Sequence, residues 1–274
     1  MAVTLASTVP LPGGVSMPVL GLGTAGASGR ACVAAVTEAL RIGVRLIDTA
    51  SLYGNEREVG LAVRESGVPR DDVFVTTKVA SKDQGVRATV DACEASLRRL
   101  GLSVVDLYLI HWPSRRRRLD AWKAMERLLG LGKVRSIGVS NYMVRHLDEI
   151  REAGGATPAV NQIELSPFLR QSDVVDACVA RGIAVEAYSP LTRGRRLDDP
   201  TVRRIAAACG RSPAQVLLRW SLRHGFIPIP KSERPERIRE NAAVFDFDLS
   251  PDGMGALDGL DADAHFDWDP TDVP

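Results

Sequence analysis

Short apolar runs rich in β-branched residues alternate along the chain with longer segments in which apolar residues recur every three or four positions. The short runs predict β-strands and the longer segments predict amphipathic helices. The strand-like runs are VLGLG (19–23), VRLID (44–48), VFVTTK (73–78), VVDLYLI (104–110), VRSIGVS (134–140), AVNQI (159–163), IAVEAYS (183–189) and FIPIP (226–230). The helix-like segments lie at 29–43, 55–66, 86–101, 119–132, 143–154, 172–182, 212–225 and 234–244. This alternation predicts parallel strands that are joined by helices.

Eight such units, evenly spaced over 274 residues, predict a closed (β/α)8 TIM barrel, a single α/β domain that spans 1–274. An open doubly wound sheet can be assembled from the same units, but the even spacing favours closure. Ahead of the first strand, VTLAS (3–7) and VSMPV (15–19) flank PLPGG, which predicts a short N-terminal β-hairpin across the lower end of the barrel. We then expect the active site at the opposite end, where the strands finish.

Composition narrows the class of protein. Apolar residues make up 45% of the chain and charged residues 25%, the balance of a globular protein with a sizeable core. The 35 Lys and Arg nearly cancel the 34 Asp and Glu, so no global positive field attracts nucleic acid or an anionic membrane, and we expect a small-molecule partner. No apolar run reaches the roughly 18 residues of a membrane span, and the N-terminus does not resemble a signal peptide. The four scattered cysteines form no metal-binding pair, so we expect a cytoplasmic protein without a metal.

Four reactive side chains stand at or just after the ends of successive predicted strands: Asp48, Tyr53, Lys78 and His111. In a barrel all four face one mouth. Taken alone, each has an ordinary structural explanation, such as a turn cap, a half-buried phenol, a lysine that reaches solvent or a histidine bonded to a backbone carbonyl. Taken together, they form a group with one coherent chemistry.

That chemistry requires these residue types. A phenol with a pKa near ~10 exchanges protons poorly at neutral pH, and a neighbouring ammonium lowers that pKa, so we expect Lys78 to lower the pKa of Tyr53. A carboxylate at Asp48 keeps the ammonium charged and in place, and the imidazole of His111 can hold a substrate carbonyl oxygen. Such a site protonates a carbonyl oxygen while a nucleophile attacks the carbon. A hydride from a nicotinamide supplies that nucleophile.

Seven segments, in order and at consistent spacing, resemble the aldo-keto reductase family. They are DTASLYGNE (48–56), VTTKV (75–79), LIHWP (109–113), GVSN (138–141), NQIELSP (161–167), AYSPL (187–191) and IPKSERPERIREN (229–241). The resemblance covers nearly the whole chain, and the subgroup it resembles is the bacterial diketogluconate-reductase-like group. It implies the (β/α)8 barrel, and it implies that the family's Asp, Tyr, Lys and His tetrad falls on Asp48, Tyr53, Lys78 and His111.

The resemblance also implies a nicotinamide site. In the family, the residues that match Ser140, Asn141 and Gln162 bond the nicotinamide carboxamide, and the residue that matches Tyr188 stacks beneath the ring. The ordinary explanations of these residues are loop caps and a core aromatic. Further residues that the resemblance places near the cofactor are Gly23, Thr24, Ser189 and Leu191.

IPKSERPERIREN follows the eighth predicted strand and opens a helix, where free N–H groups and the helix dipole favour an anion. The residues that predict a phosphate pocket are Lys231, Ser232, Arg234 and Arg237. A solvated basic helix start is the alternative. Because arginine forks match phosphate oxygens, these cations favour the 2′-phosphate of NADPH over the ribose hydroxyls of NADH. The resemblance implies that Arg237, Glu240 and Asn241 contact the adenine end.

GLGTAG (21–26) fits the G-x-G-x-x-G spacing of a Rossmann dinucleotide site, with Asp48 where that fold has its ribose acid. A Rossmann dehydrogenase leaves IPKSERPERIREN unexplained. We therefore assign GLGTAG to the first barrel strand and its loop, and Asp48 to catalysis.

The substrate pocket departs from the family at one wall. Family members commonly have tryptophan after G-L-G-T, and this chain has Ala25, which predicts a wider pocket. Trp112 remains as one aromatic wall. Phe266 and Trp268 in the C-terminal tail are candidate lids, with simple packing against a helix as the alternative.

The run Arg115–Arg118 follows the catalytic histidine at the expected mouth. It is either a solvated surface or a patch that draws in acidic carbonyl substrates. The sequence thus predicts an NADPH-dependent reductase of aldehydes and ketones with Tyr53 as the general acid. The alternative is a nicotinamide-binding sensor with little turnover. Members of the family are often monomers, and we expect a monomer.

Overall fold

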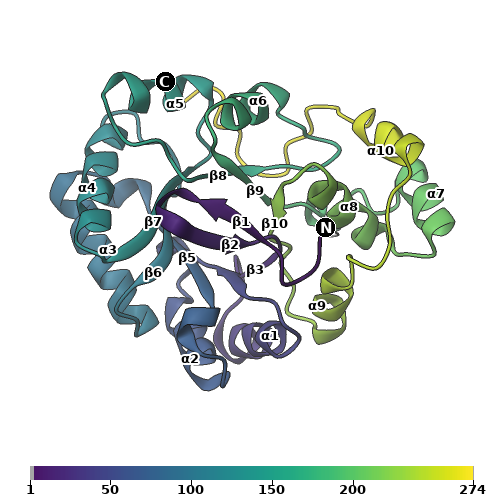
Figure 1. Ribbon diagram of the computed structural model, residues 1–274, viewed down its shortest axis with the longest axis horizontal. Coiled ribbons are helices and arrows are strands. Elements are labelled where there is room, and N and C mark those ends of the chain that lie inside the picture. Colours follow the sequence, from purple (N-terminus) through teal and green to yellow (C-terminus); the bar gives the residue numbers. More distant parts are fainter. Residues whose placement is uncertain (1–2, 274) are drawn as a thin grey trace.

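Eight parallel strands run around one axis in a computed structural model that describes residues 3–273 (Figure 1). In chain order they are β3 (Gly21–Gly23), β4 (Leu46–Asp48), β5 (Phe74–Val79), β6 (Val105–Ile110), β7 (Val134–Ser140), β8 (Val160–Glu164), β9 (Ala184–Tyr188) and β10 (Ile227–Pro228). Each strand pairs with the next along the chain. The two ends of the sheet meet where the N–H of Gly23 donates to the carbonyl oxygen of Pro230 at 3.1 Å. The predicted (β/α)8 barrel is confirmed.

Helices surround the strands on the outside of the barrel (Figure 1). Those that the sequence predicts are α1 (Gly29–Arg41), α2 (Glu56–Glu65), α3 (Val86–Leu100), α4 (Arg118–Gly130), α5 (Val144–Glu152), α6 (Ser172–Ala180), α8 (Pro213–Arg223) and α9 (Pro235–Ala242). The sequence pattern did not predict α7 (Pro200–Cys209) and α10 (Pro251–Asp258). Both begin at a proline preceded by a capping residue, Asp199 or Ser250, whose side chain accepts from backbone N–H groups of the first turn.

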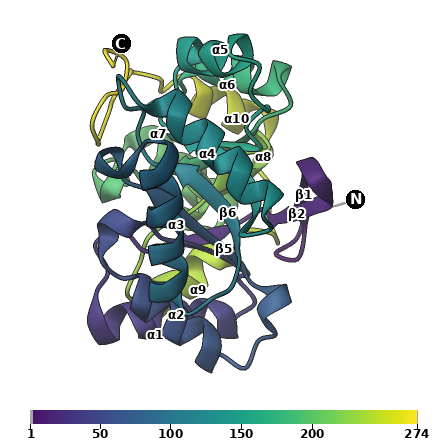
Figure 2. The ribbon, with the colours of Figure 1, turned by 90° about the vertical axis from the view of Figure 1, so that its left-hand side faces the viewer.

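A short antiparallel hairpin closes one end of the barrel. It consists of β1 (Thr8–Leu11), the 3-10 turn η1 (Pro12–Gly14) and β2 (Val15–Pro18). Leu11 and Met17 pack against apolar side chains that point inward from the barrel strands. A hairpin is present as predicted, but the predicted first strand, residues 3–7, is wrong: a turn between Thr4 and Ser7 occupies that segment, and the strand is formed by Thr8–Leu11 instead. Figure 2 shows the hairpin on one side of the barrel and the C-terminal tail on the other.

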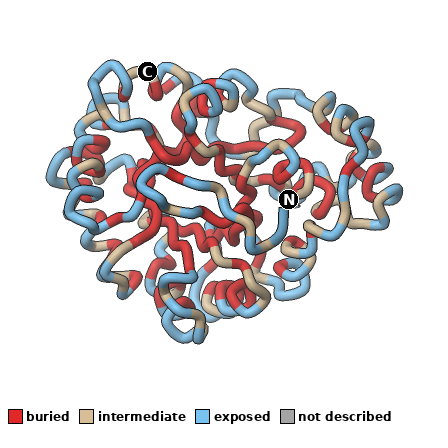
Figure 3. Tube along the Cα trace, in the orientation of Figure 1, coloured by how far each residue is buried: buried red, intermediate tan, exposed pale blue. Residues whose placement is uncertain are grey.

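Burial follows the layers of the barrel. Buried residues concentrate in the strands and on the inner faces of the helices (Figure 3). One apolar core lies between strands and helices, and a second fills the lumen next to the hairpin. Within residues 3–273, no helix has the length and apolar character to cross a membrane, and no three His, Cys, Asp or Glu side chains are grouped to hold a metal ion.

Candidate active site

Strand geometry places the polar residues of the predicted site inside the barrel. Side chains alternate between the two faces of a strand, so residues two apart share a face. In β5, Phe74 packs in the lumen and Val75 packs outward against the helices, which directs Lys78 inward. The same alternation directs inward the side chains of Asp48, His111, Ser140, Gln162, Glu186 and Tyr188.

Lys78 is the centre of this group and is fully buried. Its ammonium donates to Asp48 Oδ1 at 2.6 Å, to the carbonyl oxygen of Thr49 at 3.0 Å and to the hydroxyl of Tyr53 at 3.2 Å. An ammonium has three hydrogens, and these partners use all of them. Burial disfavours the charge, but the adjacent carboxylate of Asp48 outweighs it, and the pKa of Lys78 lies above its ordinary value. Lys78 is therefore a cation fixed beside the phenol.

A buried asparagine fixes the loop that carries Tyr53. The tyrosine ends the 3-10 turn η2 (Ser51–Tyr53), and Gly54 then takes a positive φ of 70°. Asn55 accepts from Thr49 Oγ1 at 2.6 Å and donates to two backbone carbonyl groups in the loop after β3, at 2.8 and 2.9 Å. The tyrosine loop is thereby tied to the ends of β3 and β4. Sequence reasoning missed Asn55, because an asparagine directly before a helix usually indicates only a cap.

The pKa of Tyr53 is set by opposing effects of its surroundings. Burial raises it, Lys78 lowers it and Asp48 raises it, and the pKa lies above its ordinary value. The predicted lowering by Lys78 is present, but the removal of a phenolate from water and the charge of Asp48 together outweigh it. The phenol therefore stays protonated at neutral pH, and protonated is the form that a proton donor needs.

His111 lies on the other side of the phenol. The two ring centroids are 5.5 Å apart and the rings are nearly perpendicular. Burial, and then the charge of Lys78, lower the pKa of His111 to about 3, so the imidazole is neutral. Its Nδ1 is buried and has no hydrogen-bond partner among residues 3–273. The Tyr53 hydroxyl and His111 Nε2 can together hold one carbonyl oxygen.

The residues predicted to hold the nicotinamide also come together. Asn141 Nδ2 donates to Ser140 Oγ and to the carbonyl oxygen of His111, both at 3.1 Å, and Asn141 Oδ1 accepts from the hydroxyl of Tyr188 at 3.0 Å. Asn141 and Ser189 have positive φ values of 62° and 48°, which are uncommon outside glycine. Both directly follow barrel strands, β7 and β9. Strained backbone at strand ends is a frequent feature of binding sites.

Gln162 connects the tetrad to a residue that sequence reasoning missed. Its Nε2 donates to Asp48 Oδ2 at 2.9 Å and to Glu186 Oε2 at 2.7 Å. In the described part of the chain no group donates to Gln162 Oε1, so this oxygen is free to accept a hydrogen bond from a ligand. The signal for Glu186 was present: it is the one acidic residue in the apolar run IAVEAYS.

The segment after β10 gathers the predicted phosphate residues at the start of α9. Ser232 Oγ accepts from the N–H of Arg234 at 3.1 Å, and no side chain caps the helix. Over residues 3–273, no group pairs with the guanidinium of Arg234 or of Arg237, whereas Lys231 lies 3.4 Å from Glu233. Uncapped N–H groups and unpaired guanidinium groups fit an anion.

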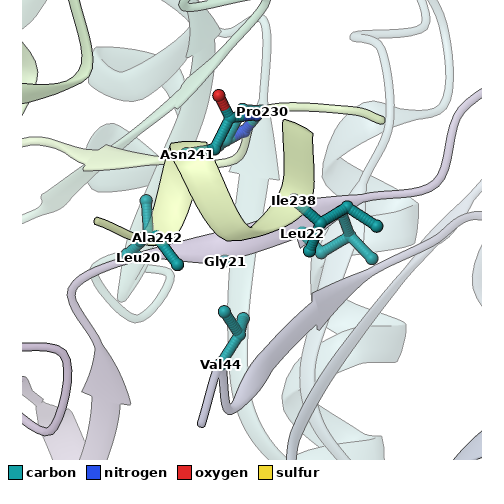
Figure 4. A pocket seen from close by; sticks show the side chains of 8 residues that line it. All are labelled: Leu20, Gly21, Leu22, Val44, Pro230, Ile238, Asn241 and Ala242. Atoms are coloured by element: carbon teal, nitrogen blue, oxygen red, sulfur yellow. The ribbon is translucent and has the colours of Figure 1, made fainter. Parts of the chain in front are cut away.

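Packing against β3 holds α9 in place (Figure 4). Ile238, Asn241 and Ala242 face Leu20 and Leu22 around a pocket of about 10 Å³, with room for one water molecule at most. This pocket is too small for a cofactor. The buried contact instead fixes the direction of the helix, and therefore the position of its first turn.

The glycine segment at the start of the barrel is a strand. Residues 21–23 form β3, and α1 begins only at Gly29, so no helix N-terminus follows directly on the glycines. Thr24 Oγ1 donates to the carbonyl oxygen of Asp48 at 2.9 Å. The assignment of GLGTAG to the first barrel strand and its loop is confirmed. Of the other predicted cofactor residues, Leu191 is half-buried in the loop after β9, and Glu240 is half-buried on α9.

Two tryptophans meet beside the histidine. The ring of Trp112 lies 6.3 Å from that of His111 and 4.9 Å from that of Trp268. The tail that carries Trp268 is held by Glu164, which accepts from the backbone N–H groups of Phe266 and the next residue at 2.9 and 3.1 Å. The C-terminal tail therefore reaches the mouth of the barrel, and an exposed indole lies on the aromatic wall.

The remaining predicted pocket residues are more dispersed. Ala25 is exposed just after β3. The ring of Phe266 lies 5.9 Å from the guanidinium of Arg195. Leu52, directly before Tyr53, is 54% exposed, and an exposed leucine in a loop leaves no pattern that sequence reasoning can detect.

The arginine run does not act as one unit. Residues 115–117 are exposed, as expected of a solvated surface or a substrate-attracting patch. Arg118 instead begins α4, is buried, and forms a bidentate pair with Glu149 of α5, with both N–O distances at 2.6 Å. The expected cationic run is therefore three residues long, because Arg118 joins two helices.

Known proteins resemble this chain over nearly its full length. The model of the aldo/keto reductase family matches residues 19–262. An aldo-keto reductase of Mycolicibacterium vanbaalenii is 51% identical over 96% of this chain and 95% of its own length. A glyoxal reductase of Bacillus subtilis is 44% identical over 100% of this chain and 99% of its own. The crystal structure of an aldo/keto reductase from Brucella melitensis matches with a TM-score of 0.91 at 44% identity, over 95% of this chain and 100% of that one.

Proposed function

Because this chain belongs to the aldo/keto reductase family, it is an oxidoreductase of carbonyl compounds, and we propose that it reduces aldehydes and ketones with NADPH, with Tyr53 as the general acid. The observation that carries the proposal is the position of the Lys78 ammonium, 2.6 Å from Asp48 and 3.2 Å from the phenol of Tyr53. A buried cation in this place has a direct use in proton transfer.

The reaction divides between two atoms of the carbonyl group. NADPH, when bound, supplies the hydride that the carbonyl carbon accepts. The hydroxyl of Tyr53 and Nε2 of His111 hold the carbonyl oxygen, and the phenol gives its proton to that oxygen as negative charge develops. Lys78 then stabilises the phenolate that remains, and Asp48 keeps the lysine charged. The neutral state of His111 suits this role, because a neutral N–H donates a hydrogen bond without giving up its proton.

The choice of NADPH rests on the first turn of α9. A 2′-phosphate adds two negative charges that the unpaired guanidinium groups of Arg234 and Arg237 and the uncapped N–H groups can receive. Ser140, Asn141, the oxygen of Gln162 and the ring of Tyr188 would hold the nicotinamide end. Replacing both arginines with alanine should raise KM for NADPH by at least tenfold and leave KM for NADH within about twofold.

The residues at the mouth of the barrel indicate the class of substrate. Ala25 widens the pocket where the family commonly has a tryptophan, while Trp112 and Trp268 supply apolar surface for an aromatic or aliphatic carbonyl compound. Because one of the relatives is a glyoxal reductase, we include small dicarbonyl compounds among the proposed substrates. We propose aldehydes and ketones as substrates, dicarbonyls included.

The test of this function is the steady-state rate of reduction of a panel of sugar, aliphatic, aromatic and dicarbonyl substrates, measured once with NADPH and once with NADH. The proposal predicts turnover of several aldehydes with a preference for NADPH. Binding of NADPH without turnover across the whole panel would instead support a nicotinamide sensor.

A further inference from the structure

A fifth ionisable residue lies in the barrel and is linked to the tetrad through Gln162. Glu186 sits on β9 with its side chain in the lumen, and it is completely buried. Its Oε2 accepts one hydrogen bond, from Gln162 Nε2 at 2.7 Å. Its Oε1 is buried and has no partner among the residues that the structure describes. The mechanism proposed for the tetrad does not use this carboxyl group.

The surroundings of Glu186 do not support a negative charge. The charged groups that act on it are Asp48 from β4 and Lys78 from β5, and the strand next to it, β10, contributes only Ile227 and Pro228. All three hydrogens of the Lys78 ammonium are bonded elsewhere. A buried carboxylate with one hydrogen bond and no paired cation is strongly disfavoured. Burial, and then the charge of Asp48, raise the pKa of Glu186 to about 8.

The neutral carboxylic acid has a structural consequence for Gln162. An amide nitrogen has two hydrogens, and here one goes to Asp48 and the other to Glu186. Both donors are thus used by the two carboxyl groups, and the amide oxygen is left to accept a hydrogen bond from a ligand. The hydrogen bonds form one continuous chain from Tyr53 through Lys78, Asp48 and Gln162 to Glu186.

We propose that Glu186 is a positioning residue of the reaction: in its uncharged acid form it holds the Gln162 amide against Asp48, and its ionisation weakens proton donation by Tyr53. This inference rests on the proposed function. The direction of the effect on the reduction rate follows from charge. An anionic Glu186 adds a negative charge beside Asp48 and disfavours the phenolate that forms as Tyr53 gives up its proton. Reduction therefore slows when Glu186 ionises.

The test compares kcat for aldehyde reduction at saturating NADPH at pH 6.5 and pH 9. The ratio of kcat at pH 6.5 to kcat at pH 9 should be about three- to tenfold larger in the wild type than in Glu186→Gln, because the glutamine side chain is neutral at every pH. Glu149→Gln is the matched control, because that glutamate lies on the outer helix α5 with a lowered pKa and stays charged over this range. Equal ratios in the wild type and Glu186→Gln would overturn the proposal. A wild type without turnover would overturn the proposed function instead.

A second pair of measurements separates position from charge. Glu186→Leu removes the acceptor of Gln162 and should raise KM for NADPH several-fold more than Glu186→Gln, which keeps an acceptor oxygen. Infrared difference spectra of the wild type between pH 6.5 and pH 9 should show a protonated carboxyl band that is lost at the higher pH and is missing from Glu186→Gln. Either the same band unchanged in Glu186→Gln or equal KM values in the two variants would contradict the assignment, and the infrared result would do so even if no variant were active.

Discussion

Replacing Lys78 with methionine removes the cation while keeping the shape of the side chain. The wild-type ammonium lies 3.2 Å from the hydroxyl of Tyr53 in a fully buried position. At an effective dielectric constant of about 20, a unit positive charge at that distance stabilises a phenolate by about 5 kcal/mol. If the proton is about half transferred in the transition state, roughly half of this is lost, and kcat falls about 80-fold; complete transfer gives a fall of several thousand-fold.

The substitution also leaves the carboxylate of Asp48 buried without its cation, which destabilises the fold by about 3–5 kcal/mol. The double variant Lys78→Met/Asp48→Asn removes that unpaired charge and should regain most of the lost stability without regaining turnover. Lys82→Met is the matched control, because Lys82 is exposed on a neighbouring turn.

The assay is single-turnover oxidation of bound NADPH by an aldehyde, with NADPH affinity measured separately. A folded Lys78→Met or double variant that keeps its affinity within about threefold and loses at least 80-fold in rate agrees with the mechanism. A loss of less than tenfold in a folded variant would refute the reasoning.

Three further outcomes are expected. Asn55→Ala leaves the groups that bonded its amide unpaired and should lower the free energy of unfolding by about 2–4 kcal/mol in a denaturant titration. Trp268→Ala should raise KM for an aromatic aldehyde about 2- to 10-fold and leave KM for acetaldehyde unchanged, since only a large ring can use the indole surface. Glu186 has a folded-state pKa of about 8, above its unfolded value, so its stabilising contribution is present at low pH and lost as pH rises; between pH 6.5 and 8 the wild type should lose about 2 kcal/mol more than Glu186→Gln.

The sequence predicted the barrel well because periodicity and strand length are local signals. Every predicted strand of the barrel has its counterpart, and the inward or outward direction of each side chain follows from counting residues along the strand. The missed helices α7 and α10 begin with Asp-Pro and Ser-Pro, which are start signals, but they lie outside the strand-helix alternation that organised the prediction.

The site was less predictable where its properties depend on packing. The tetrad and the phosphate residues stand in recognisable segments, but burial decides their pKa values, and burial is not visible in a sequence. Hence the sequence predicted the lowering effect of Lys78 on the pKa of Tyr53 but not the larger raising effect of burial. The roles of Asn55 and Glu186 depend on hydrogen bonds between strands that are distant in the chain, and the pairing of Arg118 with Glu149 depends on how two helices meet.

The most direct test of the mechanism is the rate of hydride transfer in Tyr53→Phe, measured in a single turnover with NADPH already bound. Phenylalanine keeps the ring beside His111 and removes only the hydroxyl. We expect the rate to fall by about 10²- to 10⁴-fold while the Kd for NADPH changes by less than about threefold. A rate within tenfold of the wild type would show that the proton comes from another group and would contradict the account.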